Sequence, residues 1–179
     1  MIMLRIAVLL AAGLSAVPCL AADASSPARV ANDFYAVYAT FHPSDGIPDA
    51  AGRAKYGPFL SPEFEKLLAD ASAAETRFLK ANKGSPPLIE GDLFTSMFEG
   101  ATAYNVGACT DVQTNASCPV DLTYSNKNTA PVHWTDTVYL TKTNLGWRVN
   151  DIGYGASWSF ANKGRATTVL RQTIADSGN

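Results

Sequence analysis

Residues 118–150 read CPVDLTYSNKNTAPVHWTDTVYLTKTNLGWRVN, and this stretch decides which fold we expect. Apolar and polar side chains alternate in the two runs that flank the polar turn at 125–128. A period of two is typical of a strand with one buried face. A hairpin loop at 143–146 leads into a third run, in which Trp147 and Val149 continue the apolar face. The stretch therefore predicts an antiparallel meander.

The apolar face of this meander consists of Cys118, Val120, Leu122, Tyr124, Val132, Trp134, Val138, Leu140, Trp147 and Val149. The opposite face of the central strand carries His133, Thr135, Thr137, Tyr139 and Thr141. Upstream, residues 101–108 predict a short strand that leads into Cys109, whereas the polar residues 110–117 predict a loop.

Two helices are predicted before the meander. Each begins with a serine followed by a proline, Ser26-Pro27 and Ser61-Pro62, a pair typical of an N-cap and the first helical position. Apolar side chains then recur at helical spacing over 30–41 and over 64–79.

The remaining segments complete the expected fold. Residues 42–60 are rich in Pro, Gly and Asp and predict a long loop with a short helical turn near Ala50. Residues 164–175 predict a last short helix. The order predicts an α+β fold, in which two N-terminal helices pack on the concave side of a curved antiparallel sheet.

The first 21 residues read as a secretory signal peptide, which leaves 22–179 as a single domain. Arg5 supplies the positive charge, residues 6–17 are apolar, and small residues at Cys19 and Ala21 suit a cleavage site. A membrane anchor is an alternative, but the apolar run is shorter than the roughly 20 residues that span a bilayer. Lipidation of Cys19 is a second alternative, which the preceding proline disfavours. We expect an exported bacterial protein, periplasmic or secreted, with no transmembrane segment in the mature chain.

The composition predicts a globular protein, with 47% hydrophobic and 17% charged residues in a chain of 179. The chain has 14 Lys and Arg against 16 Asp and Glu, and loss of Arg5 would leave a net charge of −3. A mildly acidic chain argues against a nucleic-acid partner, because such proteins carry a basic face.

The mature chain would keep two cysteines, Cys109 and Cys118, and an even count in an exported chain predicts a disulfide. A metal site is the alternative, but His42 and His133 are isolated and provide no ligand cluster. We therefore expect a disulfide, no metal site and no cofactor.

Four short motifs resemble those of a known family. They are Asp33-Phe34-Tyr35, then Leu60-Ser61-Pro62-Glu63 followed by Glu90-Gly91-Asp92-Leu93-Phe94, and finally 146–152, which read GWRVNDI. Over about 28–155 the chain resembles the bacterial exported proteins grouped as domain of unknown function 3828. The resemblance implies a cystatin-like or ketosteroid-isomerase-like cone. It implies no activity and no catalytic residues.

Asp136 and Asp151 are the candidate catalytic residues. Period two puts Asp136 on the face of Trp134, and Asp151 follows Trp147 and Val149 on the inward side of the next strand. Two carboxylates in an apolar cone would repel, and at least one pKa would rise, which suits acid–base chemistry or the binding of a cation or a polar ligand. The alternative is a structural pair at the rim, bonded to backbone amides and to Tyr154 or Trp158.

Further candidates are binding residues. Asp92 would be either a pocket ligand or a turn residue that bonds local amides, and Glu99 has the same alternatives. Trp134, Trp147, Tyr104, Tyr124 and Trp158 would line a cavity or simply form core. Trp158 and Phe160 follow a Gly-rich segment and would form an apolar partner site if exposed, or anchor the tail if buried. His133 shares its face with threonines, which would be solvated sheet or a docking surface.

Two functions remain open from the sequence. The first is a non-enzymatic binding protein of unknown partner, for example an inhibitor or immunity-type protein. The second is a small-ligand cone, or an acid–base enzyme, that uses an Asp136/Asp151 pocket. The protein would be a monomer or a homodimer, since an open sheet has an edge strand on which a second copy could pair.

Overall fold

A computed structural model of the chain describes residues 26–41 and 46–177. Its elements in chain order are α1 (Pro27–Thr40), α2 (Ala50–Tyr56), the 3-10 turn η1 (Gly57–Phe59), α3 (Pro62–Ala81), β1 (Ala103–Val106), β2 (Thr110–Val112), β3 (Asn115–Tyr124), β4 (Val132–Thr143), β5 (Gly146–Gly153) and α4 (Ala166–Asp176). The α+β class is confirmed, including the short C-terminal helix. The predicted signal peptide at 1–21, with Cys19, and His42 lie outside the described residues.

The two predicted helix starts are confirmed. The side chain of Ser26 accepts a hydrogen bond from the amide of Arg29, and that of Ser61 accepts one from the amide of Phe64. Each serine thereby satisfies one of the amides that a first helical turn leaves unpaired. Asp49 does the same for α2, at the place where a short helical turn was predicted.

All strands of the sheet are antiparallel, in the order β1-β3-β4-β5, with β2 also pairing with β3. The prediction of a loop over 110–117 was wrong, because Thr110–Val112 pairs with the start of β3. All three residues of β2 are exposed, so the strand leaves no alternating pattern in the sequence. Cys109 and Cys118 form the predicted disulfide at the start of β2.

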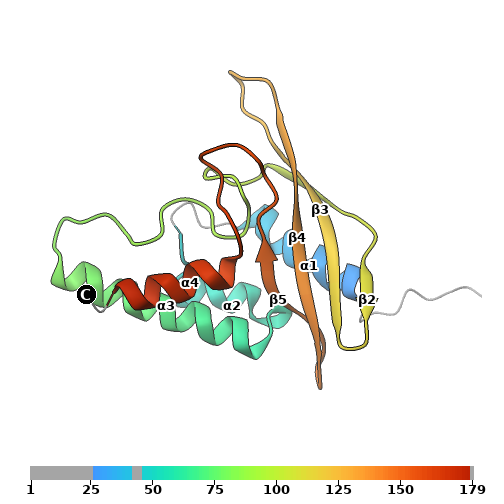
Figure 1. Cartoon of the computed structure of the whole chain (residues 1–179), viewed down its shortest axis with the longest axis horizontal. Helices are drawn as coiled ribbons and strands as arrows, with labels where there is room; N and C mark the ends of the chain where they lie inside the picture. Colours follow the sequence, from blue (N-terminus) through green and yellow to red (C-terminus); the bar gives the residue numbers. More distant parts are fainter. Residues whose placement is uncertain (1–25, 42–45, 178–179) are drawn as a thin grey trace, which may run out of the picture.

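The helices cover one face and one edge of the sheet. α1 lies across the strands, whereas α3 and α4 pack together beside β5 (Figure 1). The chain itself closes this edge, since the amide of Ser61 donates to the carbonyl of Val149 at 2.8 Å and Arg165 bridges to Gly153. At the opposite edge, β1 and β2 pair with no strand besides β3 among the described residues.

The core lies between α1 and the apolar sheet face. Its largest fully buried side chains are mainly aromatic: Phe34, Tyr35, Tyr38, Tyr56, Phe64 and Phe94. Phe34 packs edge-on against Phe94 with ring centroids 5.3 Å apart. Among the residues described, no helix has the length and apolar character that a membrane crossing needs.

Candidate functional site

The most unusual part of the fold is a buried segment without regular secondary structure, residues 91–97. Every residue from Gly91 to Met97 is buried, although the segment connects α3 to β1 and belongs to neither a helix nor a strand. Connecting segments normally lie on the surface, because buried backbone groups need hydrogen-bond partners. We call residues 91–97 the buried segment.

Side chains from distant parts of the chain satisfy its carbonyl groups. Tyr35 of α1 donates to the carbonyl of Phe94 at 3.1 Å, and Tyr154 donates to that of Leu93 at 2.7 Å. The side-chain amide of Asn162 donates to the backbone carbonyls of Asp92 and Thr95, both at 2.8 Å. The buried segment thus depends on helix α1 and on the chain after β5.

Asp92 is buried in this segment, with 2% of its surface exposed. Its carboxylate accepts the amide of Phe94 at 2.7 Å, which is the local contact expected of a turn residue, and the hydroxyl of Tyr38 at 2.7 Å. The Tyr38 hydroxyl in turn accepts the amide of Ala101. Burial, reinforced by the negative charge of Asp136, outweighs these hydrogen bonds and raises the pKa of Asp92 from 3.8 to about 7.

Asp136 points into the core, as the period of the strand predicts, and none of its surface is exposed. Its carboxylate accepts the amide of Ser96 at 2.7 Å, the indole N–H of Trp134 at 3.0 Å and the amide of Gly155 at 2.8 Å. The hydroxyl of Ser96 also donates to it. A carboxylate that receives four hydrogen bonds holds the surrounding chain together.

Asp151 does not face Asp136. The hairpin register would place Asp151 opposite Val138, but an extra residue at Asn150 shifts it opposite Tyr139 instead. Residues opposite each other on antiparallel strands share a face, so this β-bulge turns Asp151 away from the face of Asp136. The expectation that the two carboxylates lie on one face is therefore wrong.

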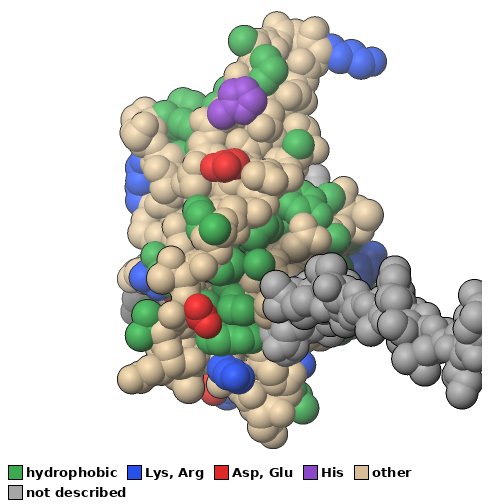
Figure 2. Space-filling model, turned by 90° about the vertical axis from the view of Figure 1, so that its right-hand side faces the viewer, with side chains coloured by type: hydrophobic (Ala, Val, Ile, Leu, Met, Phe, Trp, Pro, Cys, Tyr) green, Lys and Arg blue, Asp and Glu red, His purple; other side chains and the backbone are tan. Residues whose placement is uncertain are grey.

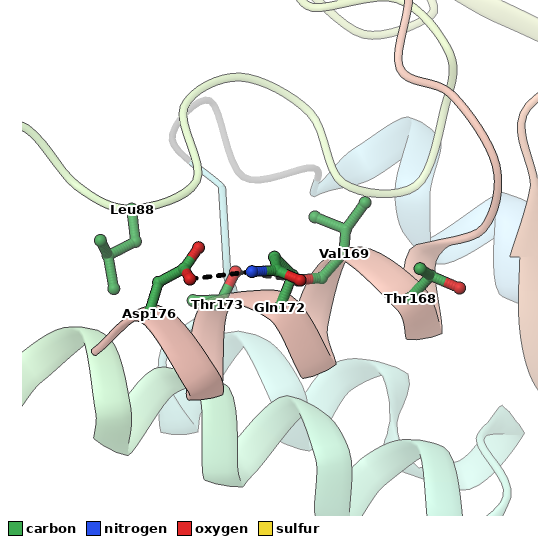
Figure 3. A pocket seen from close by; sticks show the side chains of 6 residues that line it. All are labelled: Leu88, Thr168, Val169, Gln172, Thr173 and Asp176. Carbon is green, nitrogen blue, oxygen red and sulfur yellow. Dashed lines mark hydrogen bonds between the residues drawn. The ribbon is translucent and has the colours of Figure 1, made fainter. Parts of the chain in front are cut away.

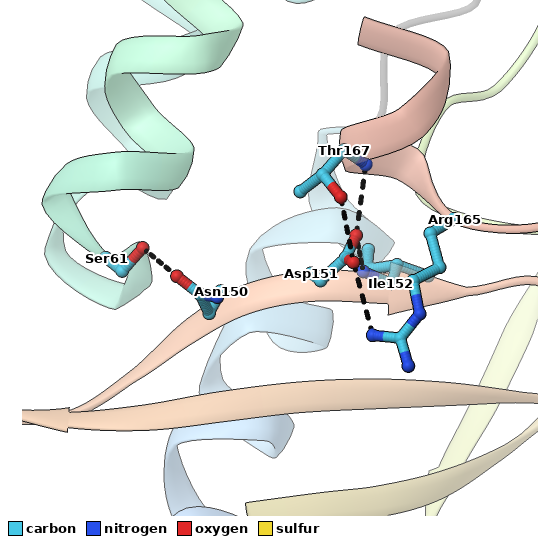
Figure 4. Close-up of polar contacts among 6 residues, drawn as sticks. All are labelled: Ser61, Asn150, Asp151, Ile152, Arg165 and Thr167. Carbon is cyan, nitrogen blue, oxygen red and sulfur yellow. Dashed lines mark hydrogen bonds and ion pairs between the residues drawn. The ribbon is translucent and has the colours of Figure 1, made fainter. Parts of the chain in front are cut away.

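Asp151 instead caps helix α4 from the neighbouring strand (Figure 4). Its carboxylate accepts the amide of Thr167 at 3.0 Å and the hydroxyl of Thr167 at 2.9 Å, and it lies 3.3 Å from the guanidinium of Arg165. The N-cap residue of α4 itself, Arg165, makes no capping hydrogen bond with its side chain. A negative charge also suits the positive end of a helix.

The segment between β5 and α4, residues 154–164, forms an Ω-loop whose two ends meet. The amide of Tyr154 donates to the carbonyl of Gly164 at 3.0 Å. Hydrogen bonds join the inner side of the Ω-loop to the buried segment. The backbone amide of Ala156 donates to the hydroxyl of Ser96 at 3.2 Å, and that of Asn162 donates to the carbonyl of Ser96 at 2.9 Å. Lys163 holds the loop further, with its ammonium 2.8 Å from the carbonyls of Ala156 and Trp158.

The Ω-loop carries the two aromatic residues singled out in the sequence, and they have different environments. Trp158 packs edge-on against Trp134, with ring centroids 5.7 Å apart, and is only partly exposed. The ring of Phe160 packs against that of Trp158, with centroids 5.9 Å apart, but 70% of the surface of Phe160 is exposed. Trp158 thus anchors the loop, and Phe160 is presented to the solvent.

The outer face of the sheet is polar. The hydroxyl of Thr123 lies 2.9 Å from a ring nitrogen of His133, and that of Thr135 donates to Asp121 at 2.7 Å. Seen from the side of β2 and β3, the molecule shows few charged side chains, with hydrophobic ones scattered among polar ones (Figure 2). On strands β3 and β4 this face exposes Asp121, His133 and Thr135, whereas at its β5 end Asp151 contacts the first turn of α4.

The surface of the described residues includes the following three pockets, and Asp92, Asp136 and Asp151 line none of these three. The first, of about 360 Å³, lies between α4 and Leu88, and Gln172 and Asp176 at its wall bond each other at 2.8 Å (Figure 3). The second, of about 240 Å³, lies at the tip of the β4–β5 hairpin, and the third, of about 210 Å³, lies beside β2.

The other candidate residues from the sequence have structural or exposed positions. Trp134 and Trp147 are buried core residues, Tyr154 donates to the buried segment, and Glu99 is exposed. Ser96 and Asn162, which connect the Ω-loop to the buried segment, were missed, because isolated serine and asparagine residues carry no spacing signal. Within 26–41 and 46–177 no three His, Cys, Asp or Glu side chains cluster as metal ligands would.

We compared the chain with protein-family models, with curated proteins and with solved structures. None of them matches it.

Proposed function

We propose that this chain is an exported binding protein that uses the Ω-loop to hold a protein partner, with Phe160 as the anchor. The observation that carries the proposal is the 70% exposure of Phe160 on a loop that is held in place by hydrogen bonds of Tyr154, Ala156, Asn162 and Lys163. An exposed aromatic side chain on a rigid base is what protein interfaces use as an energetic centre. Binding costs less when such a residue is already ordered.

Phe98 is a second exposed aromatic side chain. It leaves 49% of its surface exposed just after the buried segment, which is bonded to the Ω-loop through Ser96 and Asn162. The two loops run side by side in Figure 1. The proposed partner has an apolar hollow that receives Phe160, and this chain would then be an exported inhibitor or immunity-type protein.

The contacts of the acidic residues favour binding over acid–base catalysis. Four donors of the chain occupy the carboxylate of Asp136, and Thr167 and Arg165 occupy that of Asp151. These bonds support structural roles for both. The disulfide supports the periplasmic or secreted location, because such bonds persist in oxidising compartments.

The proposal is tested by capture with matched variants. The bait is the tagged mature chain, with the Cys109–Cys118 bond formed, exposed to periplasmic extract and culture medium of the native source. We expect one stoichiometric protein, retained by the wild type and by Val112→Ser, and lost at least tenfold with Phe160→Ser. Val112 is the control because it is 65% exposed but lies on β2.

Both variants change an exposed side chain, so both should keep the wild-type melting temperature. Retention of the partner by Phe160→Ser, or an equal loss with Val112→Ser, would show that the Ω-loop is not the binding surface. An empty bait at low salt would contradict the proposal itself.

A further inference from the structure

The tip of the β4–β5 hairpin presents an exposed leucine next to a pocket. Leu145 leaves 69% of its surface exposed at the two-residue loop between paired Thr143 and Gly146. The side chain of Thr143 fixes this loop, since it accepts the amide of Leu145 at 3.1 Å and donates to the carbonyl of Gly146 at 2.9 Å. Leu145 is thus presented on a turn that is already ordered.

The pocket beside it has apolar walls and two charged side chains. Pro58, Leu60, Pro62 and Leu145 supply the walls, and its volume of about 240 Å³ accommodates one large side chain. Two of these wall residues are prolines, which lose little conformational freedom when an interface forms. The pocket therefore suits a leucine side chain.

The two charged side chains of the pocket have opposite signs and do not pair with each other. Glu65 leaves 39% of its side chain exposed, and its Oε1 lies 3.5 Å from Arg53. Its Oε2 is buried and has no hydrogen-bond partner among the described residues. Arg148 donates to the carbonyl of Trp147 and makes no ion pair with any described residue. Arg148 is therefore available to an opposite charge from another molecule, and Glu65 keeps one carboxylate oxygen without a hydrogen-bond partner in the described part of the chain.

From these features we propose that a second copy of this chain docks here about a two-fold axis, with Leu145 of each copy in the pocket of the other and Arg148 facing the partner copy's Glu65. A two-fold interface must be self-complementary, because one patch meets itself. This patch contains a projecting side chain, a hollow of matching character, and one charge of each sign. The interface is separate from the Ω-loop and does not depend on the proposed function.

The test is sedimentation velocity of the mature chain over a range of concentrations. We expect the weight-average mass to approach twice that of the monomer as the concentration rises. Leu145→Asp should weaken dimerisation at least tenfold, because it places a carboxylate in the apolar pocket. Val112→Asp is the matched control, an equally exposed apolar residue on β2, and should dimerise as the wild type does.

A charge exchange makes the test specific for this geometry. Arg148→Glu should weaken the dimer because it faces Glu65 of the other copy with a like charge. Glu65→Arg should weaken it as well, and the two changes together should restore it at low salt. Melting curves of each variant separate an effect on the dimer from a loss of folding, since Glu65 also pairs with Arg53.

Three results would overturn the proposal. The first is a wild type that stays monomeric at every concentration. The second is a dimer that Leu145→Asp leaves intact. The third is a dimer that either single charge change weakens but the double change fails to restore while every variant remains folded.

Discussion

Ser96 donates both its backbone amide and its hydroxyl to the carboxylate of Asp136, and its hydroxyl also accepts the amide of Ala156. One small side chain therefore connects three parts of the molecule, namely the buried segment, strand β4 and the Ω-loop. Because Ser96 is fully buried, water cannot replace the bonds that its removal would break.

Ser96→Ala should lower the free energy of unfolding by about 2–4 kcal/mol, since it leaves part of a buried carboxylate and one amide without partners. Chemical denaturation of wild type and variant measures this difference. Ser125→Ala is the control, because Ser125 is exposed in the turn after β3. An equal stability of Ser96→Ala and Ser125→Ala would show that the bonds around Asp136 do not support the fold.

The stability of the protein should fall as the pH rises from about 4 to about 7. The pKa of Asp92 is about 7 in the folded chain against an ordinary 3.8, so the folded state holds this proton more tightly than the unfolded state. Asp92 therefore contributes its full share of the free energy of unfolding below its ordinary pKa. This contribution, on the order of 4 kcal/mol, is lost as the pH rises through the pKa of the folded state.

Asp92→Asn isolates this effect, because an amide stays neutral over the whole range. The measurement is the free energy of unfolding at half-unit steps from pH 4 to 8, for the wild type and the variant. We expect the wild type to lose stability relative to Asp92→Asn as the pH rises. Parallel curves would mean that Asp92 is not protonated in the folded chain at pH 5.

Thr167→Ala should loosen the first turn of α4, because it removes the hydroxyl that donates to Asp151. We expect a loss of about 1 kcal/mol, as for other helix caps, and faster amide hydrogen exchange confined to the start of the helix. The neighbouring Thr168→Ala is the control, since Thr168 is exposed. Equal exchange rates in the two variants would exclude a capping role for Asp151.

Replacing both Cys109 and Cys118 by alanine should lower the free energy of unfolding by about 2.5–3 kcal/mol, from the entropy of a loop of about ten residues. Their separation is 9 positions in the chain, and the bond holds the short strand β2 beside β3. Reduction of the disulfide in the wild type should lower the free energy of unfolding by the same amount. If reduction changed nothing in the wild type, the disulfide would not contribute to stability.

Most of the regular structure could be predicted because its causes are local. Ser26 and Ser61 are followed by proline and by apolar side chains at helical spacing, and Asp136 alternates with Trp134 and Val138. A strand keeps its period as long as each residue pairs with one partner. The inward orientation of Asp136 follows from that rule alone, and the structure confirms it.

The partner of Asp151 could not be predicted, because the β-bulge at Asn150 depends on contacts beyond the strand pair. The side chain of Asn150 accepts the hydroxyl of Ser61 at 2.7 Å, a contact between the N-cap of α3 and a strand 89 positions away. The buried segment was missed for a similar reason. Its sequence has no period, and its burial depends on Tyr35, Tyr154 and Asn162.

The buried segment has a consequence for the order of folding. Its partners come from α1, from the end of β5 and from the Ω-loop, so its carbonyl groups find no donors until both halves of the chain have met. Closing such long loops before any contact compensates for their entropy is slow. We therefore expect this segment to dock last, after the β3–β4–β5 meander has formed. Until then its apolar residues remain open to water, to chaperones and to proteases.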